Sequence, residues 1–263
     1  MLPETFWGRI QYLLQQYGTS FLTGAGNTMI IAIVGTFLGC LIGFIVGIIQ
    51  TIPVDKRDSD VKKTLVGFLK FIMACYVEFF RGTPMMVQAM FIYYGSAYLF
   101  NINMSMWFAA FFVVSINTGA YMAETVRGGI LSVDEGQTEA AKGIGMTHVQ
   151  TMMNVILPQA LRNIMPQIGN NLIINIKDTC VLSIIGIVEL FYTTKGVAGA
   201  YYTYFESFTI AMVMYFILTF VCSRLLRLLE HKMEGPQNYD LATTDTLAHT
   251  SGLYSYPKKK EEK

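Results

Sequence analysis

Long apolar runs, separated by short polar stretches, divide the chain into candidate membrane-spanning segments. Residues 29–49 read MIIAIVGTFLGCLIGFIVGII and contain 21 residues without a charge. About 20 consecutive apolar residues cross the hydrocarbon core of a bilayer as one helix, so this run predicts a transmembrane span. The same pattern predicts further spans over about 106–126, 166–188 and 207–229.

A fifth span is predicted between residues 64 and 100, and it is broken. At ~1.5 Å per residue the stretch is too long for one straight crossing, whereas the charges in its first half disfavour two full crossings. The sequence RGTP at 81–84 interrupts it, because Pro84 has no backbone N–H and Gly82 weakens a helix. The pattern therefore predicts an all-α integral membrane protein with five transmembrane helices.

Two patterns describe the N-terminal part. Apolar side chains between residues 3 and 22 share one helical face, so residues 1–22 are predicted to form an amphipathic segment at the membrane surface. In the first span, glycines recur every fourth residue and would form a smooth ridge against which another helix can pack closely; they are Gly35, Gly39, Gly43 and Gly47. The alternative is a membrane helix that merely tolerates glycine.

Composition supports a membrane protein and gives little support to catalysis. Of 263 residues, 53% are hydrophobic and 14% are charged, whereas about a quarter are charged in a typical soluble domain. The sequence contains no GxSxG, HExxH or GxxxxGK[ST] motif, so it offers no nucleophile elbow, no zinc site of that type and no P-loop for ATP. The cysteines form no CxxC pair and are interpreted as buried structural thiols; they are Cys40, Cys75, Cys180 and Cys222.

Basic residues predict the orientation, because cytoplasmic loops of membrane proteins are enriched in lysine and arginine. They gather in loop 51–63, in segment 127–165 and at the end of the last span; they are Lys56, Arg57, Lys62, Lys63, Arg127, Lys142, Arg162, Arg224, Arg227 and Lys232. The opposite side holds only Arg9 and Lys195. The N-terminus is therefore predicted outside and the C-terminus in the cytoplasm, with a polar, disordered tail over residues 233–263. A six-span interpretation would put the two loops on opposite sides.

The cytoplasmic segment 139–158 reads EAAKGIGMTHVQTMMNVILP and contains a spaced pattern. Composition alone allows either a docking element for a soluble partner or a connector that lies on the surface. The segment resembles the EAA loop of ABC importer permeases, in which E-A-A, three residues, G, nine residues and I-x-L-P follow one another. The matching residues are Glu139, Ala140, Ala141, Gly145, Leu157 and Pro158, with Val155 in place of the usual isoleucine.

Three further stretches resemble the polar amino acid permeases, also called the histidine–glutamine permease family. They are FFRGTPMMVQAMFIYYG at 79–95, GAYMAETVRGGILSV at 119–133 and IKDTCVLSIIGIVEL at 176–190, where Cys180 replaces an expected serine. The resemblance covers about 20–230. It implies a type I ABC importer transmembrane domain over residues 23–232, in which an EAA coupling loop occupies about 131–160.

The resemblance also implies the partners. Two cytoplasmic ATPase subunits would bind ATP and Mg and grip the EAA loops, so this chain itself would carry no cofactor. A second permease subunit, identical or paralogous, would complete the pathway, and an extracellular binding protein would deliver an amino acid. The expected location is a bacterial cell membrane, which the chain crosses several times. The alternative function is a stand-alone secondary amino acid transporter, which would not need an EAA segment.

Charged residues inside the predicted spans are the candidate substrate site, because ionisable groups at membrane depth usually face a cavity or a partner. Asn171, Asn175 and Asp178 are spaced i, i+4, i+7 and share one helical face. Lys177 points about 100° away from Asp178, so each charge needs another partner. The candidate substrate-binding residues are Glu78, Arg81, Thr83, Asn117, Tyr121, Asn175 and Asp178.

An amino acid needs an acceptor for its ammonium group and a donor for its carboxylate. Asp178 and Glu78 are the predicted acceptors, and the guanidinium fork of Arg81 matches a carboxylate. Alternatively, these charges only pair with one another and hold the helices together. Glu124 and Arg127 lie nearer the cytoplasm and are predicted to form either a gate or a structural pair.

Overall fold

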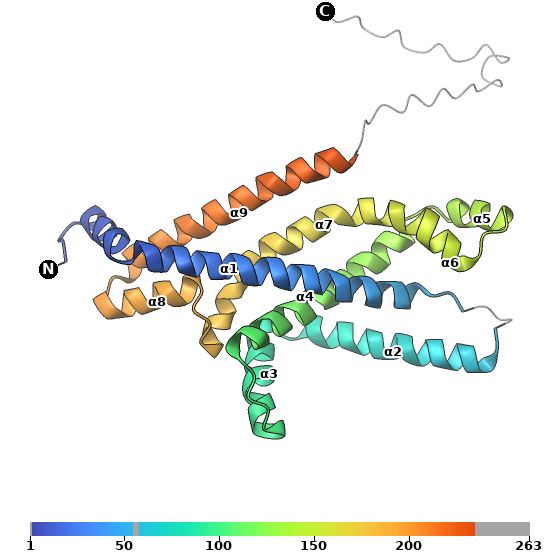
Figure 1. Cartoon of the computed structure of the whole chain (residues 1–263), viewed down its shortest axis with the longest axis horizontal. Coiled ribbons are helices and arrows are strands. Elements are labelled where there is room, and N and C mark those ends of the chain that lie inside the picture. The colour runs from blue at the N-terminus through green and yellow to red at the C-terminus, as the bar shows by residue number, and fades with distance from the viewer. Residues whose placement is uncertain (1, 55–57, 235–263) are drawn as a thin grey trace, which may run out of the picture. The chain divides into compact units, whose positions relative to one another are not determined.

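The computed structural model describes residues 2–54 and 58–234, and these residues form helices and no strand (Figure 1). The predicted all-α fold is therefore confirmed for the described part of the chain. The helices are α1 (Phe6–Thr51), α2 (Asp60–Gly82), α3 (Met85–Phe100), α4 (Met106–Leu131), α5 (Glu135–Gly143), α6 (His148–Thr151), a π-helix (Met152–Ile156), α7 (Leu157–Asp178), a 3-10 helix (Thr179–Ile185), α8 (Leu190–Tyr201) and α9 (Tyr204–Glu234).

Three helices are long and apolar enough to cross a membrane, namely α1, α4 and α9. A fourth candidate is the stretch from residue 148 to residue 185 together with α8, a pair of segments bent by 56°. The chain is thus a multi-helix membrane protein with three or four candidate spans by length and composition. The predicted count of five remains a prediction, because α2 and α3 do not meet these criteria together.

Helix α1 joins two segments that the sequence analysis separated. It begins at Phe6, where Thr5 Oγ1 accepts a hydrogen bond from the Gly8 amide, and continues without interruption to Thr51. Leu13 and Phe21, on its first part, are buried in a cluster with side chains of α8 and α9. Part of the apolar face predicted for residues 1–22 is therefore covered by the chain itself, whereas Leu14 is 45% exposed. The location of this segment at the membrane surface remains a prediction.

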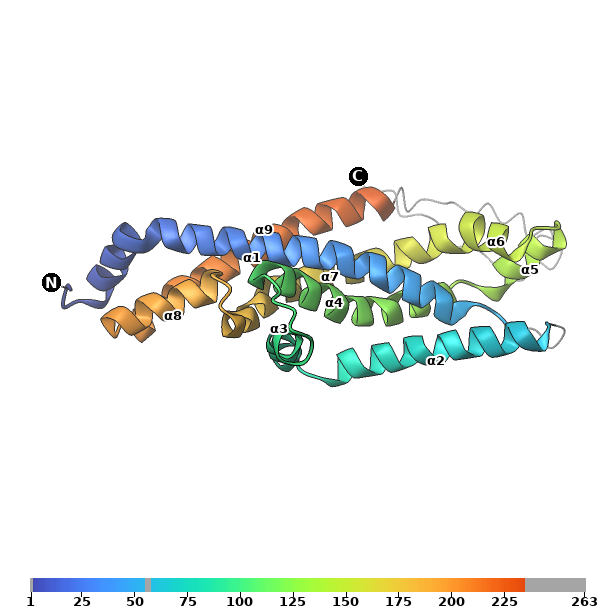
Figure 2. The same ribbon diagram turned by 60° about the horizontal axis from the view of Figure 1, so that its bottom comes forward.

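The glycine ridge of α1 packs against α4. A Cβ atom added at Gly35, Gly39, Gly43 or Gly47 would come closer than 3.0 Å to atoms of Val114, Thr118, Met122 or Val126, in that order. The ridge therefore allows close contact between the helices, as predicted. Each pair is separated by the same 79 positions, so α1 and α4 run in the same direction, as Figure 2 also shows.

The interruption at RGTP is confirmed. Helix α2 ends at Gly82, the backbone is extended at Thr83 and Pro84, and α3 starts at Met85. Proline removes a backbone donor but is well tolerated directly before a helix, so the sequence ends one helix and starts another within two residues. In Figure 1, α3 points away from the direction of α2.

The fourth predicted span, over about 166–188, starts earlier and ends earlier as an α-helix. Helix α7 begins at Leu157, and Pro158 lies in its first turn, where a missing N–H costs little. The α-helix ends at Asp178 and continues as a 3-10 helix to Ile185, where Gly186 adopts a positive φ of 90°. The Lys177–Asp178 pair therefore lies at the end of α7, not inside an α-helical span.

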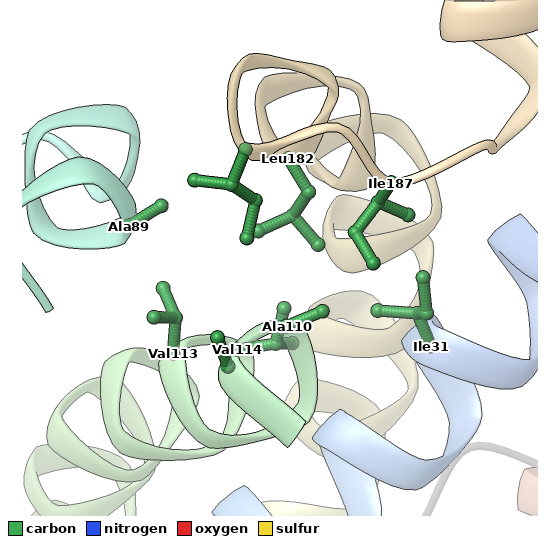
Figure 3. Close-up of a cluster of buried hydrophobic side chains, with 9 residues drawn as sticks. Ile31, Ala89, Ala110, Val113, Val114, Leu182 and Ile187 are labelled. Carbon is green, nitrogen blue, oxygen red and sulfur yellow. The ribbon is translucent and has the colours of Figure 1, made fainter. Parts of the chain in front are cut away.

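A buried apolar cluster connects these elements (Figure 3). Ile31 of α1, Ala89 of α3, Val113 of α4 and Leu182 of the 3-10 helix belong to it, and each is completely buried. Through this cluster, α3 and the 3-10 helix that follows α7 pack against each other and against the same part of α4. The core thereby fixes the two irregular parts of the chain, the break before α3 and the end of α7, relative to the long helices.

Candidate functional site

The break between α2 and α3 is held by a hydrogen-bond network. Gln88, which is 4% exposed, donates from Nε2 to the Thr83 carbonyl (2.9 Å), to Thr83 Oγ1 (2.8 Å) and to the Phe80 carbonyl (2.9 Å). Asn117 Nδ2 of α4 donates to Gln88 Oε1 (3.0 Å) and to the Phe80 carbonyl (3.3 Å). Thr83 Oγ1 in turn donates to the Phe79 carbonyl (2.8 Å), so two predicted site residues, Thr83 and Asn117, satisfy backbone groups that the break leaves open.

Gln88 was missed by the sequence analysis. It is a polar residue in the first turn of an otherwise apolar helix, directly after a break. That position was the available signal, because carbonyl groups at the end of the preceding helix lack intrahelical partners.

Arg81 and Tyr121 come together, and Glu124 joins them. Arg81 Nη1 forms a salt bridge with Glu124 Oε2, and its guanidinium carbon lies 5.6 Å from the centre of the Tyr121 ring. Both charged side chains are about two-fifths exposed, at 37% and 38%. The alternative in which charges pair with each other therefore applies to Arg81, and its partner in this chain is Glu124.

A charged cavity of about 290 Å³ lies beside this pair, between the end of α1, α2 and α4. Glu78 and Arg127, predicted from separate motifs, both line it together with Glu124. Gln50 and Lys70 also line it and were not predicted. The cavity thus combines two carboxylates with two cations, and Glu124 belongs both to its wall and to the salt bridge with Arg81.

The asparagines of α7 hold helices together. Asn175, 6% exposed, donates from Nδ2 to Thr36 Oγ1 (2.7 Å) and to Thr118 Oγ1 (2.9 Å). Asn171 Nδ2 contacts Met122 Sδ at 3.2 Å and the Gln167 carbonyl at 3.0 Å. These bonds tie α7 to α1 and α4.

Asp178 does not share the environment of Asn171 and Asn175. Lys177 and Asp178 are exposed, and neither forms a salt bridge with any described residue. Neither Asn175 nor Asp178 lines the cavity of Glu78 and Glu124. The three polar residues that were predicted to share one face of α7 therefore differ in their roles. Asn171 and Asn175 hold helices together, whereas Asp178 is exposed at the end of the helix, where a partner outside the described residues can reach it.

The EAA segment forms a short helix closed by a glycine turn. Helix α5 starts after Asp134, whose Oδ1 accepts from the Gly136 amide (2.7 Å). At its end Gly145 has φ +83°, with bonds from the Gly145 amide to the Lys142 carbonyl (2.9 Å) and from the Met146 amide to the Ala141 carbonyl (3.0 Å). This is the Schellman arrangement, which favours glycine because other residues are strained at positive φ.

The EAA residues divide into buried and exposed positions. Ala141 is buried, whereas Glu139, Ala140, Gly145 and Pro158 are exposed and Leu157 is half-buried. Three large apolar side chains nearby are also exposed, and they were not predicted: Ile144 (78%), Val149 (68%) and Met153 (60%). Exposed apolar side chains gathered on a polar segment are typical of a surface that contacts another molecule.

A protein-family model described as the inner membrane component of binding-protein-dependent transport systems matches residues 63–235, which include the break, the EAA segment and α7. The chain belongs to this family. The glutamine transport system permease protein GlnP of Escherichia coli K12 is 34% identical over 215 residues, which cover 81% of this chain and 92% of that protein. The putative glutamine transport system permease protein GlnP of Rickettsia conorii is 32% identical over 225 residues, covering 85% and 98%.

Solved structures agree with this assignment. A chain in a crystal structure of an amino acid ABC transporter with histidines has a TM-score of 0.72 and 34% identity, covering 83% of this chain and 96% of that one. A chain of the MetNI methionine ABC transporter, at 19% identity and a TM-score of 0.65, shares the fold. The resemblance to ABC importer permeases is therefore confirmed. The chain is a multi-pass membrane permease, and a carrier that acts alone is not favoured.

Proposed function

We propose that this chain is the permease subunit of an ATP-driven amino acid importer. It forms part of the translocation pathway and couples to a cytoplasmic ATPase through residues 131–160. The observation that carries the proposal is the exposed EAA segment, in which Glu139 and Ala140 are presented beside Ile144, Val149 and Met153. The names of the relatives, which refer to glutamine and other amino acids, support an amino acid as cargo.

The proposed topology has five spans, with the N-terminus outside and the C-terminus in the cytoplasm. Helices α2 and α3 form the broken second span, and the stretch from α7 to the 3-10 helix forms the fourth. The parallel direction of α1 and α4 supports this arrangement, because two spans that run the same way end on the same side. Lys56 and Arg57, and the tail over residues 235–263, belong to the prediction but lie outside the described residues.

Within the pathway, the candidate residues take two kinds of role. Glu78 and Asp178 attract the ammonium group of the cargo, and Arg81, held by Glu124 and Tyr121, binds its carboxylate. Thr83, Asn117 and Asn175 keep the surrounding helices in place, since their side chains are engaged in hydrogen bonds within the chain. Exposure of Asp178 on the single chain supports a role toward cargo or toward a second permease subunit.

The partners follow from this role. Two ATPase subunits bind ATP and Mg and contact Glu139, Ala140, Ala141, Gly145, Leu157 and Pro158 or their immediate surroundings. An extracellular binding protein delivers the amino acid, and a second permease subunit, identical or paralogous, completes the pathway. This chain itself needs no cofactor for these tasks.

The deciding experiment reconstitutes the permease with its ATPase and binding protein in liposomes. Uptake and ATP hydrolysis are measured for each proteinogenic L-amino acid. We expect one amino acid or a small group to stimulate both. Uptake that proceeds equally well without ATPase or ATP would contradict the proposed function.

A further inference from the structure

The coupling segment contains a cavity that the proposed transport pathway does not use. It has a volume of about 400 Å³, within the range of about 300–1,000 Å³ that is usual for small-molecule sites. Its walls come from the ends of α1 and α4, from α5, from α6 and from the π-helix. Figure 1 shows these elements gathered at one end of the helices.

One wall carries charges of both signs. Glu135, Thr138, Glu139 and Lys142 of α5 line the cavity, and their spacing of i, i+3, i+4 and i+7 puts them on one face of the helix. The imidazole ring of His148, from α6, also lines the cavity. Within the described ranges, no salt bridge joins these groups to one another. The wall thus offers acceptors for a cation and donors for an anion at the same time.

The remaining lining is mostly apolar. It includes Leu131 and Val133 at the end of α4, and Met152 and Ile156 of the π-helix. A charged wall that faces an apolar one suits an occupant with a charged end and an apolar or uncharged remainder. Water alone would leave the apolar wall without favourable contacts.

Thr151 supplies a second, independent observation. It lines this cavity and is 1% exposed, and its Oγ1 is the only buried side-chain nitrogen or oxygen without a hydrogen-bond partner among the described residues. A buried hydroxyl that has lost water without gaining a partner destabilises the fold. It lies directly before the π-helix, a distortion that is frequent at functional sites. A polar group bound in the cavity would give this hydroxyl a partner after a small movement of the wall.

We propose that the cavity binds a small zwitterion, a free α-amino acid. Glu135 and Glu139 accept hydrogen bonds from its ammonium group, Lys142 and Thr151 donate to its carboxylate, and the side chain lies against Met152 and its apolar neighbours. Only the placement of the cavity beside an ATPase rests on the proposed function. Glu139 then belongs both to the wall of the cavity and to the proposed ATPase-binding surface. Occupation of the cavity and ATPase binding therefore influence each other reciprocally.

The test uses the full-length permease alone, in nanodiscs of phosphatidylglycerol, so that it does not depend on the ATPase. Each proteinogenic L-amino acid is titrated by calorimetry into wild type and into Lys142→Gln and Thr151→Val. The matched control is Lys195→Gln, an exposed lysine on α8. Each titration is repeated in the Asp178→Asn background, which weakens binding in the proposed pathway. We expect at least one amino acid to bind, about tenfold or more weakly in Lys142→Gln and Thr151→Val than in the matching parent, and unchanged in Lys195→Gln.

The Tm of Thr151→Val also shows whether weaker binding in this variant results from misfolding. Because it removes an unsatisfied buried hydroxyl, it should raise Tm in the absence of amino acids while weakening their binding. Three results would overturn the proposal: no binding of any amino acid, unchanged affinity in both cavity variants, or a thermal shift that requires phosphatidylethanolamine and no free amino acid. The last result would assign the cavity to a lipid headgroup. None of these results concerns ATP-driven uptake, so they do not test the proposed function, which the liposome experiment tests on its own.

Discussion

The break before α3 and the end of α7 both place opposite charges in an apolar surrounding, with different outcomes. At the break, Arg81 and Glu124 come from α2 and α4 and form a salt bridge, and Gln88 and Asn117 bind the open carbonyl groups. At the end of α7, Lys177 and Asp178 are neighbours in sequence, point in different directions and remain exposed. Charges on different helices can neutralise each other within the chain, whereas adjacent charges on one helix need a partner from elsewhere.

The comparison implies that polar residues at the break serve stability first, and those at the end of α7 serve binding first. The coupling segment belongs with the end of α7, because Glu139 and the neighbouring apolar side chains are also exposed, and Glu139 forms no salt bridge with the described residues. Each of the following experiments tests this division.

The largest effect is expected for Asp178→Asn. The amide keeps the size but loses the charge that attracts an ammonium group, which is worth roughly 1.5–3 kcal/mol, or about 10- to 100-fold in affinity. Amino-acid-dependent ATPase activity should be greatly weakened, while Tm and the yield of the permease–ATPase complex stay at the wild-type level. Glu78→Gln serves as the companion variant at the charged cavity. If Asp178→Asn loses Tm while the surviving complex keeps its apparent affinity, the end of α7 is structural and the division fails.

Gln88→Leu should show the opposite pattern at the break. It removes a buried amide whose partners then lack hydrogen bonds, at a cost of about 1–3 kcal/mol. A clear fall in Tm is expected, with a reduced yield of folded protein, and the apparent affinity for cargo in the folded fraction should be retained. Gln15→Leu, an exposed glutamine on α1, is the matched control and should leave Tm nearly unchanged. If Gln88→Leu has the Tm of the wild type but a changed affinity for cargo, the polar residues at the break serve binding rather than stability.

Gly145→Ala tests the coupling segment. The positive φ of Gly145 makes an alanine strained by roughly 1–2 kcal/mol, so the turn after α5 should loosen and ATPase binding should weaken. Gly143→Ala is the control, because Gly143 is helical and an added Cβ meets no atom within 4 Å. The yield of permease–ATPase complex in a pull-down is measured for both variants. Equal yields for the two variants would contradict a role for this turn in docking.

The smallest effect concerns the salt bridge between Arg81 and Glu124. Because both side chains are more than one third exposed, we expect a coupling free energy of only about 0.2–1 kcal/mol. A double-mutant cycle with Arg81→Gln and Glu124→Gln, measured by chemical unfolding, determines it. Arg81→Gln should reduce transport more than Glu124→Gln does if Arg81 also binds the cargo. Equal losses in both would leave the pair with a structural role alone.

Much of the fold follows from the sequence because its signals are local. Long apolar runs predict α1, α4 and α9, the proline at 84 predicts the break, and the four-residue glycine spacing predicts the ridge. The two segments of α1 were separated because the packing of the first one against α8 and α9 depends on residues about 170 to 200 positions away. The start of α7 was misjudged because the π-helix over Met152–Ile156 leads directly into α7 and places Pro158 in its first turn, a geometry without a clear sequence signal.

The candidate site was predicted as a set of residues but not as a set of contacts. Sequence spacing correctly put Asn171 and Asn175 on one face, but it could not reveal that Thr36 and Thr118 engage Asn175 there. Likewise, Arg81 was recognised as a carboxylate ligand, whereas the carboxylate that it binds in this chain, Glu124, lies 43 residues further on. Contacts between helices depend on their relative rotation, which periodicity alone does not determine.

The parallel pairing of α1 with α4 has a consequence for synthesis. Each glycine of the ridge meets a residue that the ribosome adds 79 positions later, so the pair cannot form as a simple hairpin during insertion. At a synthesis rate of about 5–20 residues per second, roughly 4–16 seconds pass before the partner helix has been made, and during this time the ridge faces lipid or the insertion machinery. A nascent chain arrested before α4 emerges would therefore leave the glycine ridge of α1 without its packing partner.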